Sequence, residues 1–532
     1  MVDPQRTEQE QSTARRARII GMQYADTSTI TEKPLYKDIL SIPEIKQLKV
    51  IPLIVNKNSI TFGVTTTTSQ KTMKDLNARF QDQQIVFVII SDAGFREYVL
   101  LYDPPRKIEY QDIAISRETD TTTLGQISAT MQQVRAHDML AYLVQQAFRL
   151  GASDIHLESR LDGARIRFRV HGVLHPIALL DEGKYRQLMG VLASAANIST
   201  SAEYDQTGHI NQDFQMATGE MVNVNLRVET VPAVNGIDGV LRIFNFDASM
   251  MRIDKLGLND MQTSTIKDII SRPTGLVLIV GPTGSGKTTT LYSLLNELNN
   301  DEHKIITLED PVEYQIEGIT QIPVVTREGE TFADKFRAVM RLDPDVIMVG
   351  EIRDTDTAKT ALQAALTGHL VLATYHASSA AAALTRMLDA IGENPVYASA
   401  IRLIQSQRLV RQLDPETRQE SPPTPELAEH LEKVVHEIKA DVDLSWLDSA
   451  KLYHPGASAE HPFGFNGQFA IRELMTMTPE LQKLLMRPKV ELTTEAIEET
   501  AVASGMLTMK QDGTLRALKG DTTYEEITRT VG

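Results

Sequence analysis

One glycine-rich string in the middle of the chain carries residue types that hold phosphate. It follows the pattern G-x-x-x-x-G-K-[ST] and runs through Gly281, Pro282, Thr283, Gly284, Ser285, Gly286, Lys287 and Thr288, with Thr289 next. In such a loop, backbone N–H groups and a helix N-terminus surround the phosphate oxygens. Lys287 would reach the β- and γ-phosphates, and the Thr288 hydroxyl would ligate Mg²⁺. The string therefore predicts a site for ATP and Mg²⁺.

The flanking residues predict the elements that would hold this loop. Leu276 to Val280 is a short run of branched aliphatic residues, typical of a strand buried on both faces. Beyond Lys287, leucines recur at the spacing of a helix. The alternative is a glycine turn before an ordinary helix. A buried strand before the loop and a helix after it favour the phosphate site.

Ionisable residues stand at the ends of three further apolar runs. The runs lie in "IITLEDPVEYQ" (305–315), "DPDVIMVGEIRD" (343–354) and "TGHLVLATYHA" (367–377). Their ionisable groups are Glu309, Asp310, Glu313, Glu351, His369 and His376. Because open parallel sheets bind ligands at the carboxyl edge of their strands, we expect these groups to meet at one triphosphate.

Each of these groups also has an ordinary explanation by itself. Asp310 precedes a proline and can simply start a turn. Glu351 can pair with Arg353 at the surface, where such a pair contributes little stability. A lone histidine is more often structural than catalytic. Their joint occurrence downstream of the glycine-rich loop favours the functional interpretation.

Composition excludes several classes of protein. The chain has 532 residues and a formal net charge of −16, which argues against a broad electrostatic grip on nucleic acid. It has no cysteine, so disulfides and thiolate metal sites are excluded, and a reducing compartment is expected. The longest apolar runs are the length of strands, so we expect no transmembrane helix and a cytoplasmic location.

The pattern along the chain predicts several segments. The predicted segments are 1–18 (a disordered tail), 19–120 (a small α+β domain), a linker at 120–130, 130–248 (a second α+β domain), 250–412 (alternating strands and helices), 413–465 (a proline-rich break and an acidic helical stretch) and 466–532 (a helical subdomain). Alternation over 250–412 predicts a mainly parallel sheet covered by helices.

Four strings closely resemble the secretion ATPases of type II secretion and type IV pilus systems, in the export or extension branch. They are "ITLEDPVEYQIEG", "RLDPDVIMVGEIRD", "TALQAALTGHLVLATYHA" and "GASDIHLE". The resemblance runs from about residue 35 to the C-terminus. It implies an α/β fold with a RecA-like P-loop NTPase core, a PAS-like α+β domain before it, an additional N-terminal α+β domain, and a C-terminal helical subdomain. It also implies a homohexamer that binds ATP between the PAS-like domain and the core.

The resemblance also implies roles for individual residues. Glu309, Asp310 and Glu313 form an acidic box, with Glu313 as the general base. Glu351 would hold Mg²⁺, through water, together with Thr288. His369 and His376 would sense the γ-phosphate and contact the neighbouring domain. Two arginines would swing onto the phosphates from the PAS-like domain, namely Arg227 in "LRVETVP" and Arg242 in "LRIFNF".

The chain also departs from the family pattern. Family members often carry paired CxxC motifs that bind zinc after the core, whereas the segment 413–465 has no cysteine, so we expect no zinc site there. "YDQTGHINQ" replaces a "PQDGR"-like string, which puts a nucleotide or interdomain role of that loop in doubt. The N-terminal module lacks the RLGxxL-type motif of members that bind cyclic dinucleotide, so we do not expect that ligand.

The function expected from the resemblance is an ATP-driven motor that assembles pilus or pseudopilus subunits. The N-terminal module would meet an inner-membrane platform protein or another component of the machinery, so the chain would be peripheral to the cytoplasmic membrane and reach it through partners alone. Direct contact with nucleic acid is not expected. Two alternatives stay open: a retraction or DNA-uptake motor of the same fold, and a nucleotide-binding scaffold with little hydrolysis.

Overall fold

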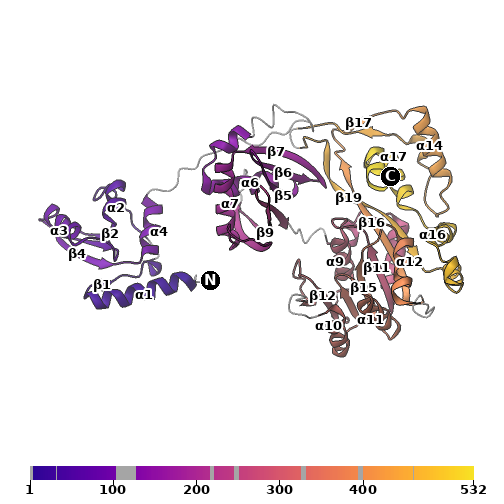
Figure 1. Cartoon of the computed structure of the whole chain (residues 1–532), viewed down its shortest axis with the longest axis horizontal. Coiled ribbons are helices and arrows are strands. Elements are labelled where there is room, and N and C mark those ends of the chain that lie inside the picture. The colour runs from indigo at the N-terminus through magenta and orange to yellow at the C-terminus, as the bar shows by residue number, and fades with distance from the viewer. Residues whose placement is uncertain are drawn as a thin grey trace. The chain divides into compact units, whose positions relative to one another are not determined.

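The chain divides into two units, Met1–Glu109 and Tyr110–Gly532. The computed structural model describes residues 4–30, 33–102, 128–215, 221–244, 251–324, 331–392, 399–458 and 461–532. Figure 1 labels the elements, and each unit is considered by itself. The predicted linker at 120–130 lies mostly outside the described residues.

The first unit is a four-stranded sheet with helices. Its strand order is β1-β4-β3-β2, in which β2 and β3 are antiparallel and the other neighbours are parallel. The elements are α1 Pro4–Ile20, β1 Gln23–Tyr24, α2 Ile42–Leu48, β2 Val50–Val55, β3 Ser59–Val64, α3 Gln70–Arg79, β4 Gln84–Ile89 and α4 Asp92–Tyr102. Three apolar runs form β2, β3 and β4 because their branched and aromatic side chains fill one core, and this mixture of strands and helices agrees with the α+β composition predicted for 19–120.

Helix α1 corrects the prediction of a disordered tail over 1–18. The helix runs from Pro4 to Ile20, and Figure 1 shows it as the indigo ribbon nearest the N-terminus. Ala17 is fully buried, and the carboxylate of Glu10 accepts hydrogen bonds from Ser91 Oγ at 2.7 Å and from the Tyr24 hydroxyl at 2.5 Å. The prediction was wrong because polar contacts, rather than an apolar stripe, hold this helix.

The second unit begins with a six-stranded antiparallel sheet. The strand order is β7-β6-β5-β10-β9-β8. The elements are α6 Met139–Arg149, β5 Ala152–Arg160, β6 Gly163–Val170, β7 Val173–Leu180, α7 Glu182–Ala196, β8 Gln206–Gln215, β9 Met221–Ala233 and β10 Gly236–Phe244. Helices α6 and α7 pack their apolar sides into the same core as the inward residues of these strands. These helices and strands agree with the α+β composition predicted for 130–248.

A seven-stranded sheet follows in the same unit. Its order is β13-β12-β14-β15-β11-β16-β19, and all neighbours are parallel except β16 and β19. The elements are α8 Asp260–Ile270, β11 Gly275–Val280, α9 Lys287–Leu298, β12 Ile305–Glu309, β13 Thr320–Pro323, α10 Phe332–Val339, β14 Val346–Val349, α11 Thr355–Leu366, β15 Leu370–Tyr375, α12 Ala380–Ile391, β16 Ile401–Leu413 and β19 Phe465–Thr476. The predicted, mainly parallel sheet is confirmed.

Helices cover both faces of this sheet. Successive side chains of β11 point to opposite faces: Leu276 and Leu278 join one apolar cluster with α10, α11 and α12. Val277 and Ile279 join another cluster with α8 and α9. All six residues of β11 are buried, which explains why this run is continuously apolar.

Strand β19 corrects the prediction that 466–532 is wholly helical. Phe465–Thr476 pairs with β16 from Leu403↔Thr476 to Leu413↔Phe465 and forms an edge of the large sheet. The segment "FNGQFAIRELMT" mixes buried and half-buried positions, so its apolar residues fit a helix and a strand about equally. The remaining elements are β17 Gln419–Glu420, α14 Pro425–His436, β18 Tyr453–His454, α15 Pro479–Leu485, α16 Thr494–Ala503, α17 Met509–Leu518 and α18 Tyr524–Val531.

No helix within the described ranges is long and apolar enough to cross a bilayer.

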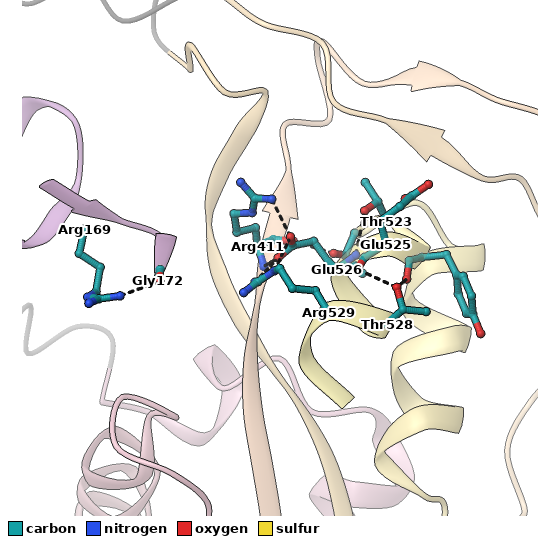
Figure 2. A network of polar contacts seen from close by, with 10 residues as sticks. Arg169, Gly172, Arg411, Thr523, Glu525, Glu526, Thr528 and Arg529 are labelled. Atoms are coloured by element: carbon teal, nitrogen blue, oxygen red, sulfur yellow. Dashed lines mark hydrogen bonds and ion pairs between the residues drawn. The ribbon is translucent and has the colours of Figure 1, made fainter. Parts of the chain in front are cut away.

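A buried carboxylate ties the last helix to the sheet. Glu526 of α18 accepts hydrogen bonds from Arg411 Nη2 of β16 at 2.6 Å and from Arg529 Nε at 3.0 Å (Figure 2). The Glu526 side chain is only 3% exposed. Burial alone would raise the pKa of Glu526, but the hydrogen bonds from Arg529 and Arg411 outweigh it and lower the pKa to about 2.

This geometry predicts the effect of Glu526→Gln on stability. The variant leaves Arg411 buried without its anion, so the free energy of unfolding should fall by about 3 kcal/mol at pH 7. Because the folded pKa lies below the ordinary value of 4.5, the contribution of Glu526 is complete above pH 4.5 and is lost as the pH falls toward 2. Denaturant titrations at several pH values measure this, and the two proteins should converge in acid.

The matched control is Glu525→Gln, which removes a neighbouring carboxylate that is exposed to solvent. Its free energy of unfolding should stay within about 0.5 kcal/mol of the parent value. Equal effects of the two substitutions would contradict the role given to Glu526.

Candidate functional site

The glycine-rich loop joins β11 to α9 and has the backbone of a phosphate-binding loop. Gly281 and Gly286 have φ of +150° and +81°, which L side chains rarely adopt. A Cβ on Gly281 would lie 2.5 Å from Ser285 Oγ and 2.7 Å from the carbonyl oxygen of Gln407, too close for any side chain. Gly286 is the N-cap of α9, so the loop leads directly into a helix N-terminus.

A buried glutamine on the neighbouring strand β16 fixes this loop. Gln407 Nε2 donates to the carbonyl of Ser285 at 2.7 Å, and Gln407 Oε1 accepts from Thr290 Oγ1 at 3.0 Å. Gln405 donates to the same Oε1 at 2.8 Å. Sequence reasoning missed both glutamines. Their signal was two amides inside the otherwise apolar string "IRLIQSQRLV", because buried polar residues in a central strand need partners.

Lys287 begins α9 and lies back over its own loop. Its Nζ donates to the carbonyls of Gly281 at 3.0 Å and Pro282 at 2.8 Å. Burial lowers the pKa of Lys287, and the charge of Glu351 opposes that shift. The ammonium therefore lies beside the loop, at the place where a phosphate-binding lysine is needed.

Thr288 and Glu313 lie together at the same place. The Thr288 side chain lies close enough to the Glu313 carboxylate to lower its pKa, although the two come from different segments of the chain. Surrounding protein raises the pKa of Glu313, and the charge of Glu309 adds to the rise. Glu313 nevertheless stays open to solvent, which suits a base that must reach a water molecule.

Two arginines from the six-stranded sheet act on Glu313. Arg242 of β10 and Arg227 of β9 are cross-strand partners, and their charges lower the pKa of Glu313 against the net rise. Each is held by a carboxylate of its own sheet: Arg242 Nε donates to Asp154 at 2.9 Å, and Arg227 Nε to Glu229 at 2.6 Å. The charges of both arginines thus reach the acidic residue singled out from the sequence, while their ion pairs are with Asp154 and Glu229.

Glu309 is a buried supporting residue in this structure. It is 3% exposed and accepts hydrogen bonds from Thr307 Oγ1 at 2.5 Å and from Gln321 Nε2 at 3.0 Å, as well as from the hydroxyl of Tyr292. Tyr292 belongs to α9, so Glu309 links the end of β12 to the helix behind the glycine-rich loop.

Glu351 and His376 meet at the carboxyl edge of the sheet. His376 Nε2 lies 3.2 Å from Glu351 Oε2. Arg353 forms an ion pair with Glu351 and a longer one with Asp310 at 3.5 Å. The ends of β12, β14 and β15 therefore deliver one continuous group of charged side chains, as the sequence predicted for these residues.

His369 does not join this group within one chain, which corrects the sequence prediction. It precedes β15, and its carbonyl accepts from the N–H of Gly275, the first residue of β11. Since β11 and β15 are parallel and pair along all six residues, His369 lies at the amino edge, roughly 16 Å from the edge that carries Lys287. Its ring Nδ1 lies 3.0 Å from the carbonyl oxygen of Ala364.

Comparison with known proteins agrees with this geometry. A family model described as "Type II/IV secretion system protein" matches residues 131–529. A "Type II secretion system protein E" of Xanthomonas campestris is 37% identical over 423 residues, which cover 79% of this chain and 71% of that protein. The "Type IV pilus assembly ATPase PilB" of Pseudomonas aeruginosa is 31% identical over 523 residues, or 96% of this chain and 88% of that protein.

Solved structures also match in fold. The X-ray structure of the Legionella pneumophila ATPase DotB has a TM-score of 0.53 and 23% identity, and the match covers 79% of this chain and 99% of that one. At this identity the likeness concerns the fold alone. The family model covers most of the chain, and the two relatives cover 79% and 96% of it. The chain belongs to the type II/IV secretion system protein family.

Proposed function

We propose that this chain is a Mg²⁺-dependent ATPase that drives the assembly of type IV pilus subunits or of type II secretion pseudopilus subunits. One observation carries the proposal: the glycine-rich loop leads into the N-terminus of α9, the ammonium of Lys287 lies against that loop, and Thr288, which would ligate the metal, lies beside Glu313, which would act as the base. Names of relatives in the family, a secretion protein E and a pilus assembly ATPase, support the process assigned.

The residues fit a triphosphate and its metal. Gly281 and Gly286 let the loop backbone pack closely against Gln407 in the positive-φ conformation of a phosphate-binding loop, and Lys287 lies beside the loop with carbonyl partners that an anion could replace. Thr288 and Glu351 would hold Mg²⁺, Glu351 through water. When bound, the metal would neutralise phosphate charge and orient the triphosphate.

Hydrolysis needs a base and cations, and the chain has both. Glu313 would take the proton of the attacking water, and its raised pKa makes it a better proton acceptor than an ordinary carboxylate. Arg242 and Arg227 would stabilise negative charge on the phosphates, a task that suits a fixed guanidinium charge. His376 would respond to the γ-phosphate through its contact with Glu351.

The finer architecture is also part of the proposal. The seven-stranded sheet would be a RecA-like core, and the six-stranded sheet a PAS-like domain that closes over the nucleotide. The chain would act as a homohexamer on the cytoplasmic face of the membrane, with the first unit meeting components of the machinery. Retraction is the second candidate within the same fold, and a full-length match to a pilus assembly ATPase favours assembly over it.

The first test is Lys287→Ala. The substitution removes the charge that would hold the β- and γ-phosphates, so ATP hydrolysis should fall by a factor of about 10² or more. Phosphate release by the purified full-length protein measures it. Lys267→Ala is the matched control, because Lys267 forms only an exposed pair with Glu297 on the protein surface. Hydrolysis near the parent rate in the Lys287 variant would overturn the ATPase proposal.

Glu313→Gln tests the base. It keeps the size of the side chain and removes the proton acceptor, so kcat should fall by about 10²-fold while ATP affinity stays within a few-fold. Single-turnover hydrolysis and a fluorescent ATP analogue measure the two quantities. Glu317→Gln, an exposed neighbour on the same segment, serves as control. An equal loss of affinity and turnover would make Glu313 a metal-binding or structural group instead.

Arg242→Gln tests the link between the six-stranded sheet and the base. Arg242 lowers the pKa of Glu313, so its loss should raise that pKa further and move the acid limb of the pH–rate profile to higher pH. The maximal rate should also fall, by about 10-fold. The control is Arg160→Gln, which makes the same charge change at the last residue of β5. An unmoved acid limb would show that Arg242 acts elsewhere.

A further inference from the structure

A second cation lies beside the glycine-rich loop, on the strand that braces it. Arg408 follows Gln407 in β16, and its Nη1 donates to the carbonyl of Gln407 at 3.1 Å. That carbonyl faces Gly281, where an added Cβ would come within 2.7 Å of it. Lys287 donates to the carbonyl of Gly281 itself. The ammonium and the guanidinium therefore flank the same glycine.

Neither cation forms an ion pair with a carboxylate in the part of the chain that the structure describes. Lys287 and Arg408 form hydrogen bonds to carbonyl oxygens and no ion pair with any described acidic residue. Burial lowers the pKa of Lys287 and the charge of Arg408 adds to that shift, while the charge of Glu351 opposes it. Burial also lowers the pKa of Arg408, and the charge of Glu473 opposes that shift. Two like charges in a partly desolvated place leave a need for an anion between them.

The other end of the guanidinium reaches the segment after β15. Arg408 Nη2 donates to the carbonyl of Ser378 at 3.0 Å. Ser378 stands between His376, which contacts Glu351, and Ser379, the N-cap of α12. The planar guanidinium of Arg408 thus contacts both the strand beside the glycine-rich loop and the segment that leads into α12.

A buried carboxylate continues this connection. Glu473 of β19 accepts hydrogen bonds from the first N–H groups of two helices, Ala380 of α12 at 2.6 Å and Met509 of α17 at 3.3 Å. It is 6% exposed, and burial raises its pKa, which the charge of Arg408 opposes. Glu473 therefore contacts the starts of both α12 and α17 and also interacts with the charge of Arg408.

We propose that Arg408 is a positioning residue that responds to phosphate charge. It adds a second cation of the same chain beside Lys287. Through Ser378 and Glu473, it also couples an occupied site to the starts of α12 and α17. The inference rests on the proposed ATPase function. When a triphosphate occupies the loop, the guanidinium shifts toward the anion, its hold on Ser378 weakens, and Glu473 keeps the two helix starts moving together.

The test compares Arg408→Gln with Arg408→Lys in the full-length protein. Removing one positive charge weakens the more highly charged nucleotide most, so the preference for Mg–ATP over Mg–ADP should fall about 10-fold in Arg408→Gln. Lysine keeps the charge, so Arg408→Lys should retain that preference. A lysine ammonium lacks the planar guanidinium that bridges the carbonyls of Gln407 and Ser378, so Arg408→Lys should lose the coupling between the nucleotide site and the two helix starts.

Coupling is read by hydrogen exchange of peptides that cover the starts of α12 and α17, with and without a non-hydrolysable ATP analogue. The parent protein should show a nucleotide-dependent change in both, and both Arg408 variants should lose it. Arg402→Gln is the matched control: it lies on the same strand at the amino edge of the sheet, where Arg402 donates to Thr274, and should behave as the parent.

The outcomes separate the inference from the function on which it rests. A parent protein without ATP hydrolysis would overturn the proposed function. An active parent with an unchanged nucleotide preference and unchanged exchange in Arg408→Gln would overturn the role of Arg408 alone. Loss of the ATP preference in Arg408→Lys as well would show that the positive charge is not the agent, and would also overturn it.

Discussion

The buried amide of Gln407 joins the phosphate-binding loop to the strand beside it, and much of the second unit is arranged around that contact. An amide in a central strand is tolerated only when both its donor and its acceptor groups have partners, and here Ser285, Thr290 and Gln405 provide them. Because the loop backbone is held from one side, its N–H groups keep their direction without a ligand. A loop that is already in position loses little entropy on binding.

That constraint also explains why β16 is long. Its first half pairs with β11 in parallel, and the part from Leu403 to Leu413 pairs with β19 in the opposite direction. The strand thus carries, in order, the residues that brace the loop, the second cation at the site, and Arg411, which anchors the last helix through Glu526. One strand therefore contacts both the glycine-rich loop and the last helix, α18.

The sequence predicts the local parts of this site better than the long-range ones. Strand, loop and helix around Lys287 follow from neighbouring residues, and so do the carboxylates at the ends of β12 and β14. Gln407 and Arg408 were missed because they come from a strand more than 100 residues away, and no local pattern ties them to the loop. His369 was misplaced because a residue before a parallel strand lies at the opposite edge from one after it. The helix at the N-terminus was missed because buried polar pairs, which composition does not reveal, hold it.

The antiparallel pairing of β16 with β19 has a consequence for the segment between them. Residues 414–464 leave the sheet after Leu413 and return at Phe465, its own partner in the ladder, and the N–H of Asp414 donates to the carbonyl of Gly464 at 3.1 Å. In topological terms the whole segment is the loop of one wide hairpin, closed at its base by the sheet. The entropy of closing a loop grows only slowly with its length. Segments of different length would therefore close this hairpin at similar entropic cost, and what fixes the present one is its packing, because Leu431 and Leu452 share an apolar cluster with α17 and α18.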